Sequence, residues 1–162
     1  MLNKNKFYKV LRLAVSIVAC QMVGVIGAIF TTPKIGSWYL ALQKPSFNPP
    51  SWIFGPVWTS LFFLMGIALF LVWEKGFTSK KAKTALLFFV SQLLLNILWS
   101  VLFFGLGKPL FALIEIFVLY AFIAITILSF VKISKVAAWL LLPYLYWVAF
   151  ASVLNLMIVL LN

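Results

Sequence analysis

Five long apolar segments limit what this chain can fold into. A helix rises about 1.5 Å per residue, so about 20 apolar residues cross the roughly 30 Å hydrocarbon layer of a bilayer. Segments of that length cover residues 11–30, 52–73, 85–104, 110–131 and 136–161. In the whole chain 65% of the residues are hydrophobic, against about half in a soluble globular domain. We therefore expect an all-α integral membrane protein whose single domain, residues 1–162, is a five-transmembrane-helix bundle.

The basic residues lie at the ends of these segments and are shared unequally between the two sides of the membrane. The net charge is +11, and ten of the 13 Lys and Arg residues lie on the side of the N-terminus: Lys4, Lys6, Lys9, Arg12, Lys75, Lys80, Lys81, Lys83, Lys132 and Lys135. The opposite side has Lys34, Lys44 and Lys108. Because cytoplasmic loops carry the excess of Lys and Arg, we expect a cytoplasmic N-terminus and an outside C-terminus, in a bacterial cell membrane. Charge spread over separate loops argues against nucleic-acid binding.

The first connection, residues 31–51, is unlike a solvated linker. The stretch from Trp38 to Trp58 holds three Trp, one Tyr, two Phe and four Pro within 21 residues. Proline fixes φ and lacks a backbone donor, so the prolines between positions 45 and 50 cannot lie inside a helix. The aromatic content argues against disorder. We expect this long, aromatic- and Pro-rich first loop to be an ordered lid over something that the helices enclose.

Small residues recur at every fourth position of the first apolar segment, namely Ser16, Cys20, Gly24 and Ala28. Small side chains let helix backbones approach closely in lipid, where packing and not hydrophobicity drives helix association. This stripe therefore predicts a helix-packing face. Its partner could be another helix of the same chain or a second copy, and the spacing does not distinguish the two.

Three other segments carry aromatic or polar side chains on one face at helical spacing. These faces consist of Phe54, Trp58, Phe62, Met65 and Leu69 in the second segment, Gln92, Asn96, Trp99 and Phe103 in the third, and Tyr144, Trp147, Ala151 and Asn155 in the fifth. Each face alone could be core packing, and the amides could be hydrogen-bonded links between helices. Their convergence favours a cavity with aromatic walls and a polar anchor. Within the fifth segment, Pro143 predicts a kink.

The chain has two acidic residues and no His. Glu115 is the carboxylate within a predicted span, where a charge is costly and typically functional. Its place soon after Pro109 also allows a position near the membrane surface, paired with Lys108. Glu74 lies in a basic loop, where we expect a solvated charge. General acid–base catalysis and metal-dependent hydrolysis lack their usual residues here, so we assign no catalytic residue and no metal ligand.

Four blocks of sequence resemble the translocator protein / tryptophan-rich sensory protein family, once called peripheral-type benzodiazepine receptors. They read W-Y-x-x-L-x-K-P-S-F-x-P-P over residues 38–50, F-G-P-V-W over 54–58, Q-L-x-L-N-x-x-W-S over 92–100 and W-L-L-x-P-Y-x-x-W-x-x-F-A-x-x-L-N over 139–155. The resemblance covers nearly the whole chain from Trp38 onward. It implies a five-helix bundle, commonly a homodimer, with a ligand cavity that opens toward the first loop.

The resemblance also implies ligands and a pocket. Family members bind tetrapyrroles such as protoporphyrin IX and haem, so a porphyrin or haem is expected as ligand, with no obligatory cofactor. By position within the matching motifs, the ligand-binding residues are Tyr39, Pro49, Phe54, Trp58, Phe62, Asn96, Trp99, Trp147 and Ala151. Basic residues at the mouth, Lys34, Lys44 or Lys108, could meet porphyrin propionates. The chain departs from the family in two places: Phe47 stands where a Trp is usual, and no Lys or Arg follows Tyr144 or Tyr146 to complete a sterol-recognition pattern.

Three functions fit these features. The first is a membrane receptor or sensor that binds a flat, hydrophobic molecule in a cavity within the helix bundle. The second is an enzyme that degrades a bound porphyrin in a light- and oxygen-dependent reaction, with the ligand as photosensitiser. The third is a transporter of porphyrin- or sterol-like lipids, although five helices without an internal repeat are few for alternating access. Membrane lipid is the expected surrounding partner in all three.

Overall fold

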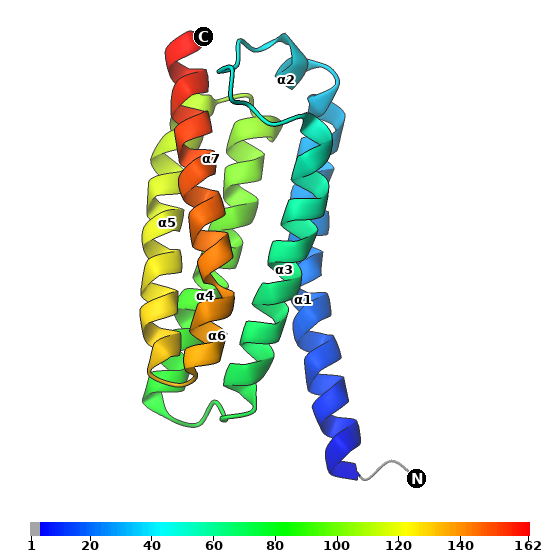
Figure 1. Cartoon of the computed structure of the whole chain (residues 1–162), viewed down its shortest axis with the longest axis vertical. Helices are drawn as coiled ribbons and strands as arrows, with labels where there is room; N and C mark the ends of the chain where they lie inside the picture. The colour runs from blue at the N-terminus through cyan, green and yellow to red at the C-terminus, as the bar shows by residue number, and fades with distance from the viewer. Residues whose placement is uncertain (1–3) are drawn as a thin grey trace.

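The structure is a computed structural model that describes residues 4–162, so the first three residues of the predicted domain lie outside it. Five helical columns stand side by side (Figure 1). They are α1 (Lys4–Ile35), α3 (Ser51–Trp73), α4 (Lys80–Ser100) with its π-helical continuation η1 (Val101–Gly105), α5 (Pro109–Val131), and α6 (Lys135–Leu140) followed by α7 (Leu142–Leu161). All five columns are long and apolar enough to cross a membrane. The predicted all-α, five-helix membrane bundle is confirmed.

Helices α1 and α4 are longer than the apolar segments that predicted them. Helix α1 extends beyond the predicted residues 11–30 in both directions. Helix α4 begins at Lys80 and not at residue 85, because the Ser79 hydroxyl accepts a hydrogen bond of 3.1 Å from the Ala82 amide. Such an N-cap provides a partner for a helix-terminal donor. Hydropathy therefore predicts the part of each helix that crosses the membrane and underestimates the whole helix.

The small-residue stripe of α1 packs inside the same chain. Ser16 and Cys20 are fully buried. A Cβ on Gly24 would lie 2.8 Å from the ring of Phe62 in α3, and one on Gly27 would lie 3.2 Å from the Ser100 hydroxyl oxygen in α4. The sequence left open whether this stripe packs against the same chain or against a second copy. In the structure it packs against α3 and α4 of the same chain.

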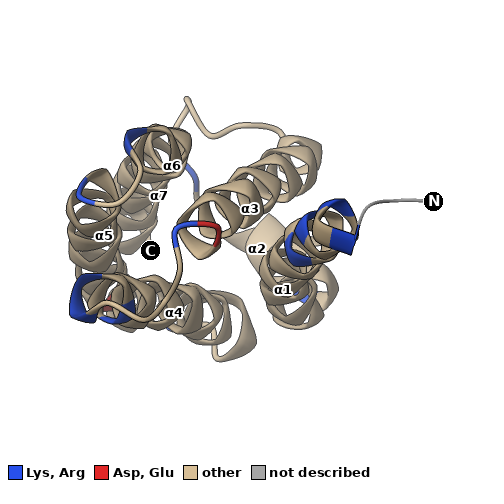
Figure 2. Ribbon diagram, turned by 90° about the horizontal axis from the view of Figure 1, so that it is seen from below, with Lys and Arg blue, Asp and Glu red and all other residues tan. Residues whose placement is uncertain are grey.

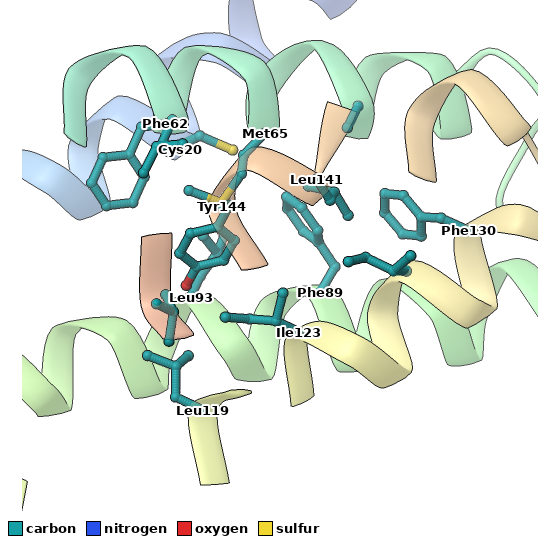
Figure 3. Close-up of a cluster of buried hydrophobic side chains, with 14 of the residues drawn as sticks. Cys20, Phe62, Met65, Phe89, Leu93, Leu119, Ile123, Phe130, Leu141 and Tyr144 are labelled. Atoms are coloured by element: carbon teal, nitrogen blue, oxygen red, sulfur yellow. The ribbon is translucent and has the colours of Figure 1, made fainter. Parts of the chain in front are cut away.

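Apolar side chains from all five columns form a buried cluster, and Figure 3 shows part of it. The ring of Phe89 in α4 stacks on that of Phe130 in α5, with centroids 5.5 Å apart. Met65 of α3 and Tyr144 of α7 are almost completely buried in the same cluster. Close packing of this kind makes the cluster the rigid support for the rest of the bundle.

Helices α3 and α7 are not close neighbours in the bundle. Helix α3 packs against α1 and, at its far end, against α6, whereas α7 packs against α5. In Figure 1 the upper parts of α3 and α7 accordingly stand apart, with α4 behind them. Side chains from these helices line a cavity.

Two of the five columns are irregular. The fifth column breaks at Leu141, between α6 and α7, so that Pro143 falls in the first turn of α7, where its missing N–H costs no hydrogen bond. The kink predicted from Pro143 is therefore a helix break. In η1 the Leu106 amide donates to the carbonyl of Val101 at 2.8 Å, a π-helical bond that the sequence did not predict.

The first loop is ordered, as predicted, and contains the short helix α2 (Trp38–Ala41). Tyr39 is 5% exposed, and its ring contacts those of Phe103 and Phe104 in η1. The Tyr39 hydroxyl donates to Oδ1 of Asn48 at 2.9 Å, which closes the loop on itself. Two bonds of 3.0 Å join the backbone of Gln43 to the amide of Asn162, so the loop is also tied to the end of α7.

The two acids differ from expectation. Glu74 is not a solvated charge: it accepts a hydrogen bond of 3.0 Å from Arg12 and lies 3.5 Å from the ammonium of Lys9. Glu115 is 7% exposed, and neither of its oxygens has a partner among residues 4–162. The pairing with Lys108 is absent there, because that ammonium lies over the ring of Phe111, 5.5 Å from its centroid.

Candidate ligand-binding cavity

A cavity of about 260 Å³ lies beneath α2, between α1, α3, α4 with η1, and α7. Eight of the nine sequence-predicted residues line it: Tyr39, Phe54, Trp58, Phe62, Asn96, Trp99, Trp147 and Ala151. Pro49 does not. Its carbonyl accepts a hydrogen bond of 2.9 Å from the side chain of Asn48, so its place is in the loop that leads into α3. The three predicted faces thus converge on one space, as their spacing indicated.

Aromatic rings form the wall between α3 and α7. Trp58 stacks on Phe62 with centroids 5.6 Å apart and an interplanar angle of 28°. Phe54 meets Trp147 edge-on at 5.9 Å, and this contact spans the space between the two helices. Rings with fixed neighbours present flat apolar surfaces at a low cost in side-chain entropy. The wall is therefore suited to a planar, apolar ligand.

Most polar side chains of the cavity already bind protein groups. Asn96 donates from Nδ2 to the hydroxyl of Tyr144 at 3.1 Å, and Trp99 donates from Nε1 to Oδ1 of Asn155 at 3.2 Å. Asn155 in turn donates to the carbonyl of Pro109 at 2.9 Å. The amide of Asn96 thus links α4 to α7, as one interpretation predicted, and its side chain also lines the cavity, so a role as ligand anchor stays a prediction.

The indole N–H of Trp147 is the exception. It is buried and has no hydrogen-bond partner among residues 4–162. The other buried polar atoms without a partner belong to Ser16, Gln92 and Glu115, which do not line the cavity. A buried donor without an acceptor costs about 1–3 kcal/mol. An acceptor atom of a ligand would remove that cost, but because the nitrogen has almost no accessible surface, neighbouring side chains would have to move to admit it.

Helix α1 supplies lining residues that sequence reasoning missed, namely Gly24, Gly27, Ala28, Thr31, Thr32 and Ile35. The four-residue stripe was the available signal, but it predicted packing alone. Its lower part does pack, whereas Ala28 is exposed and borders the cavity. Phe103 and Asn155, which share the predicted faces, also line the cavity, but Gln92 lies in the core with its Nε2 3.9 Å from the sulfur of Met65.

The basic residues at this end do not reach the cavity, contrary to the expectation that they stand at its mouth. Lys34, Lys44 and Lys108 are absent from its lining. The ammonium of Lys44 donates to the carbonyls of Leu40 at 3.2 Å and Leu42 at 3.0 Å, and it lies 4.8 Å from the ring centroid of Tyr39. This lysine therefore holds the lid together.

The cavity has few groups that could ligate a metal. Cys20 and Met65 are buried in the core and do not line it. Residues 4–162 contain no cluster of His, Cys, Asp and Glu side chains suited to a metal ion. Tyr39 does line the cavity, but its hydroxyl already donates to Asn48.

Phe47, at the position where the resemblance expects Trp, is 49% exposed and also lies outside the lining.

Comparison with known proteins identifies the family. The profile of the TspO/MBR family matches residues 16–161. The chain belongs to this family. The tryptophan-rich protein TspO of Archaeoglobus fulgidus is 47% identical over 153 residues, which cover 94% of this chain and 98% of that protein. The translocator protein of Homo sapiens is 40% identical over 132 residues, or 80% and 78% of the two chains. The tryptophan-rich sensory protein of Cereibacter sphaeroides is 37% identical over 137 residues, or 85% and 82%.

The TspO/MBR match confirms the resemblance that the four motif blocks indicated. It also extends that resemblance to the N-terminal side of Trp38, because the matched residues begin at Ser16 in α1. The stripe that packs α1 against α3 and α4 is therefore included in the family match.

Proposed function

We propose that this TspO/MBR protein is a membrane receptor or sensor that binds a tetrapyrrole, such as protoporphyrin IX or haem, in the cavity beneath α2. The observation that carries the proposal is a space walled by stacked and edge-on aromatic rings with one unpartnered indole donor, that of Trp147. A porphyrin is planar and apolar over most of its surface, and its propionate oxygens are acceptors. Its shape and chemistry match that wall.

The size of the cavity sets a requirement on binding. Its volume of about 260 Å³ lies just below the roughly 300–1,000 Å³ usual for ligand sites. Exposed lining residues border it on α1 and α3, namely Ala28, Thr32, Ser51, Gly55 and Thr59. We expect the lid to move away from these exposed residues when the ligand binds. Part of the macrocycle would then lie between α1 and α3.

Protoporphyrin IX titration tests the proposal through quenching of tryptophan fluorescence. Trp147→Phe keeps the ring and removes the N–H, so we expect affinity to fall about two- to tenfold, as for the loss of one hydrogen bond. The matched control is Trp139→Phe, because Trp139 is 70% exposed and outside the cavity. Saturable binding that Trp147→Phe weakens and Trp139→Phe leaves unchanged supports the site. Equal binding by both variants and the parent would place the ligand elsewhere.

The same titration separates the receptor from the photochemical enzyme and the transporter. Porphyrin spectra that stay constant in light and air, with protein in excess, agree with a receptor. Loss of the porphyrin bands in light but not in the dark would indicate degradation. Ligand flux into sealed vesicles that exceeds the flux into protein-free vesicles would indicate transport.

The orientation in the membrane and the homodimer belong to the proposal as well. Lys and Arg gather at the end of the bundle that Figure 2 shows, which is the end of the α1 N-terminus, and we place this end in the cytoplasm. A cysteine introduced for Lys81 should then resist a membrane-impermeant thiol reagent in intact cells, whereas one introduced for Lys44 should react. The reverse labelling would invert the topology. Mass measurement of the protein in nanodiscs tests the dimer.

A further inference from the structure

A second concave surface lies where α3 leads into α4. Figure 2 views the bundle from this end, which is opposite the lid. This groove has a volume of about 570 Å³. Its lining includes Arg12 of α1, Trp73 at the end of α3, and Glu74, Lys75, Phe77 and Lys83 from the connection and the first turn of α4. The cavity beneath α2 does not include any of these residues.

The groove has more positive charge than its own acid can balance. The carboxylate of Glu74 is shared between Arg12 at 3.0 Å and Lys9 at 3.5 Å. The sequence has one further acid, Glu115, which lies in α5. Lys75 and Lys83 are exposed and have no carboxylate partner among residues 4–162. The groove therefore presents two ammonium groups that an external anion can bind.

The same groove has an aromatic side. The rings of Trp73 and Phe77 lie 5.9 Å apart at an angle of 30°, and both side chains are half-buried. The guanidinium of Arg12 lies 6.0 Å from the centroid of the Trp73 ring. Tryptophan at the end of a membrane helix lies at the level of the lipid headgroups. Charge and apolar rings thus meet at the depth where a phospholipid changes from phosphate to acyl chain.

We propose that this groove binds the headgroup of an anionic phospholipid. Lys75 and Lys83 contact the phosphate, and Trp73 and Phe77 pack against the glycerol and the first acyl carbons. Basic pockets at the cytoplasmic ends of membrane helices are suited to such headgroups. A free phosphate shares the charge but leaves the two rings uncovered, so the geometry favours the lipid. The inference is independent of the ligand in the cavity beneath α2, and its failure would leave that proposal unaffected.

The test uses calorimetric titration of the full chain in neutral detergent with monomeric dihexanoyl-phosphatidylglycerol. Dihexanoyl-phosphatidylcholine, glycerol 3-phosphate and inorganic phosphate are the comparison ligands. We expect saturable binding of the phosphatidylglycerol and at least about tenfold weaker binding of the other three. The double variant Lys75→Gln/Lys83→Gln should lose at least about tenfold in affinity, because it removes two charge-assisted contacts to phosphate.

The matched control is Lys132→Gln/Lys135→Gln, which removes the same charge from the same end of the bundle but outside the groove. Unchanged affinity in the control supports the groove, whereas an equal loss in both double variants would show diffuse attraction and overturn it. Equal binding of inorganic phosphate and phosphatidylglycerol would overturn the lipid assignment. Helix content and thermal melting followed by circular dichroism confirm that each variant is folded, and if the groove variant fails this check, Phe77→Ala replaces it with the same expected loss.

Discussion

Helices α1 and α3 contact each other at Gly24 and Gly66. Gly66 faces backbone atoms and Gly24 faces a side chain, so we expect a Gly→Ala substitution to have different effects at the two positions. A Cβ on Gly66 would lie 2.6 Å from Cα of Ile17 and 3.0 Å from its backbone nitrogen. Carbon atoms in contact are normally about 3.5–4.0 Å apart, so the backbones of α1 and α3 would have to separate by about 1 Å. Gly24 is similarly tight, but the atoms at 2.8 Å belong to the ring of Phe62, which can turn.

For Gly66→Ala we expect the free energy of unfolding to fall by about 1 kcal/mol, within limits of about 0–2.5 kcal/mol. Overpacking costs about 1–3 kcal/mol, and the better helix propensity of Ala returns about 0.5–1 kcal/mol. For Gly24→Ala the displaced ring costs about 0.5–1.5 kcal/mol, which the propensity gain nearly offsets. Because Phe62 lines the cavity, Gly24→Ala should instead weaken protoporphyrin binding.

The assay is unfolding in mixed micelles, in which dodecyl sulfate is titrated into the protein in a neutral detergent and helix content is followed by circular dichroism. Porphyrin quenching on the same samples gives the second readout. A Gly66→Ala variant as stable as Gly24→Ala would refute the reasoning, because it would mean that the backbone contact is not tight. Unchanged porphyrin affinity in Gly24→Ala would show that the ring of Phe62 is not displaced toward the ligand.

Three further predictions concern the cavity and its lid. Ala151→Leu adds bulk to the lining without polarity, so the variant should remain folded by circular dichroism and lose porphyrin quenching; normal quenching would contradict the cavity. Burial raises the pKa of Tyr39, while its hydrogen bond to Asn48 opposes the shift, so the neutral phenol is favoured in the folded lid. The stabilisation is present below the ordinary tyrosine pKa of about 10 and is lost as pH rises through the folded-state pKa. After correction for the base-catalysed intrinsic rate, the protection of the lid amides against hydrogen exchange should therefore fall at alkaline pH, and in Tyr39→Phe this protection should not change with pH. Asn162→Ala removes the acceptor of the Gln43 amide, whose exchange should become about 2- to 13-fold faster at neutral pH; an unchanged rate would show that this link does not hold the lid.

Periodicity predicted the parts of the cavity wall that lie on α3, α4 and α7, because residues spaced by three or four share one face of a helix. Trp58 and Phe62, Asn96 and Trp99, and Trp147 and Ala151 were each found in this way, and their helices do converge. The same rule could not separate the two ends of a face. Gln92 is one turn from Asn96 and shares its face, yet it lies in the core, because the cavity ends between them.

Other features depend on partners that a linear pattern does not contain. The sequence predicts a solvated Glu74 because its neighbours in the chain are loop residues. In the fold, Arg12 of α1 donates a hydrogen bond of 3.0 Å to Glu74, although the two residues are 62 positions apart in the sequence. The π-helical turn of η1 has no signature in the residues 101–105. The rings of Phe103 and Phe104 in this turn contact those of Trp38 and Tyr39 in the lid. The sequence did not predict these contacts.

The cavity beneath α2 makes the stability of the fold depend on what it holds. A molecule that fills this space binds the folded chain and not the unfolded one, so it stabilises the folded chain by about 2.7 kcal/mol at a concentration of 100 times its Kd. For a chain of this length that corresponds to an upward shift in melting temperature of about 5–10 °C. Thermodynamic linkage of this kind holds whether the occupant is sensed, carried or destroyed. A melting scan across a chemical library can therefore find occupants of this space before its physiological ligand is known.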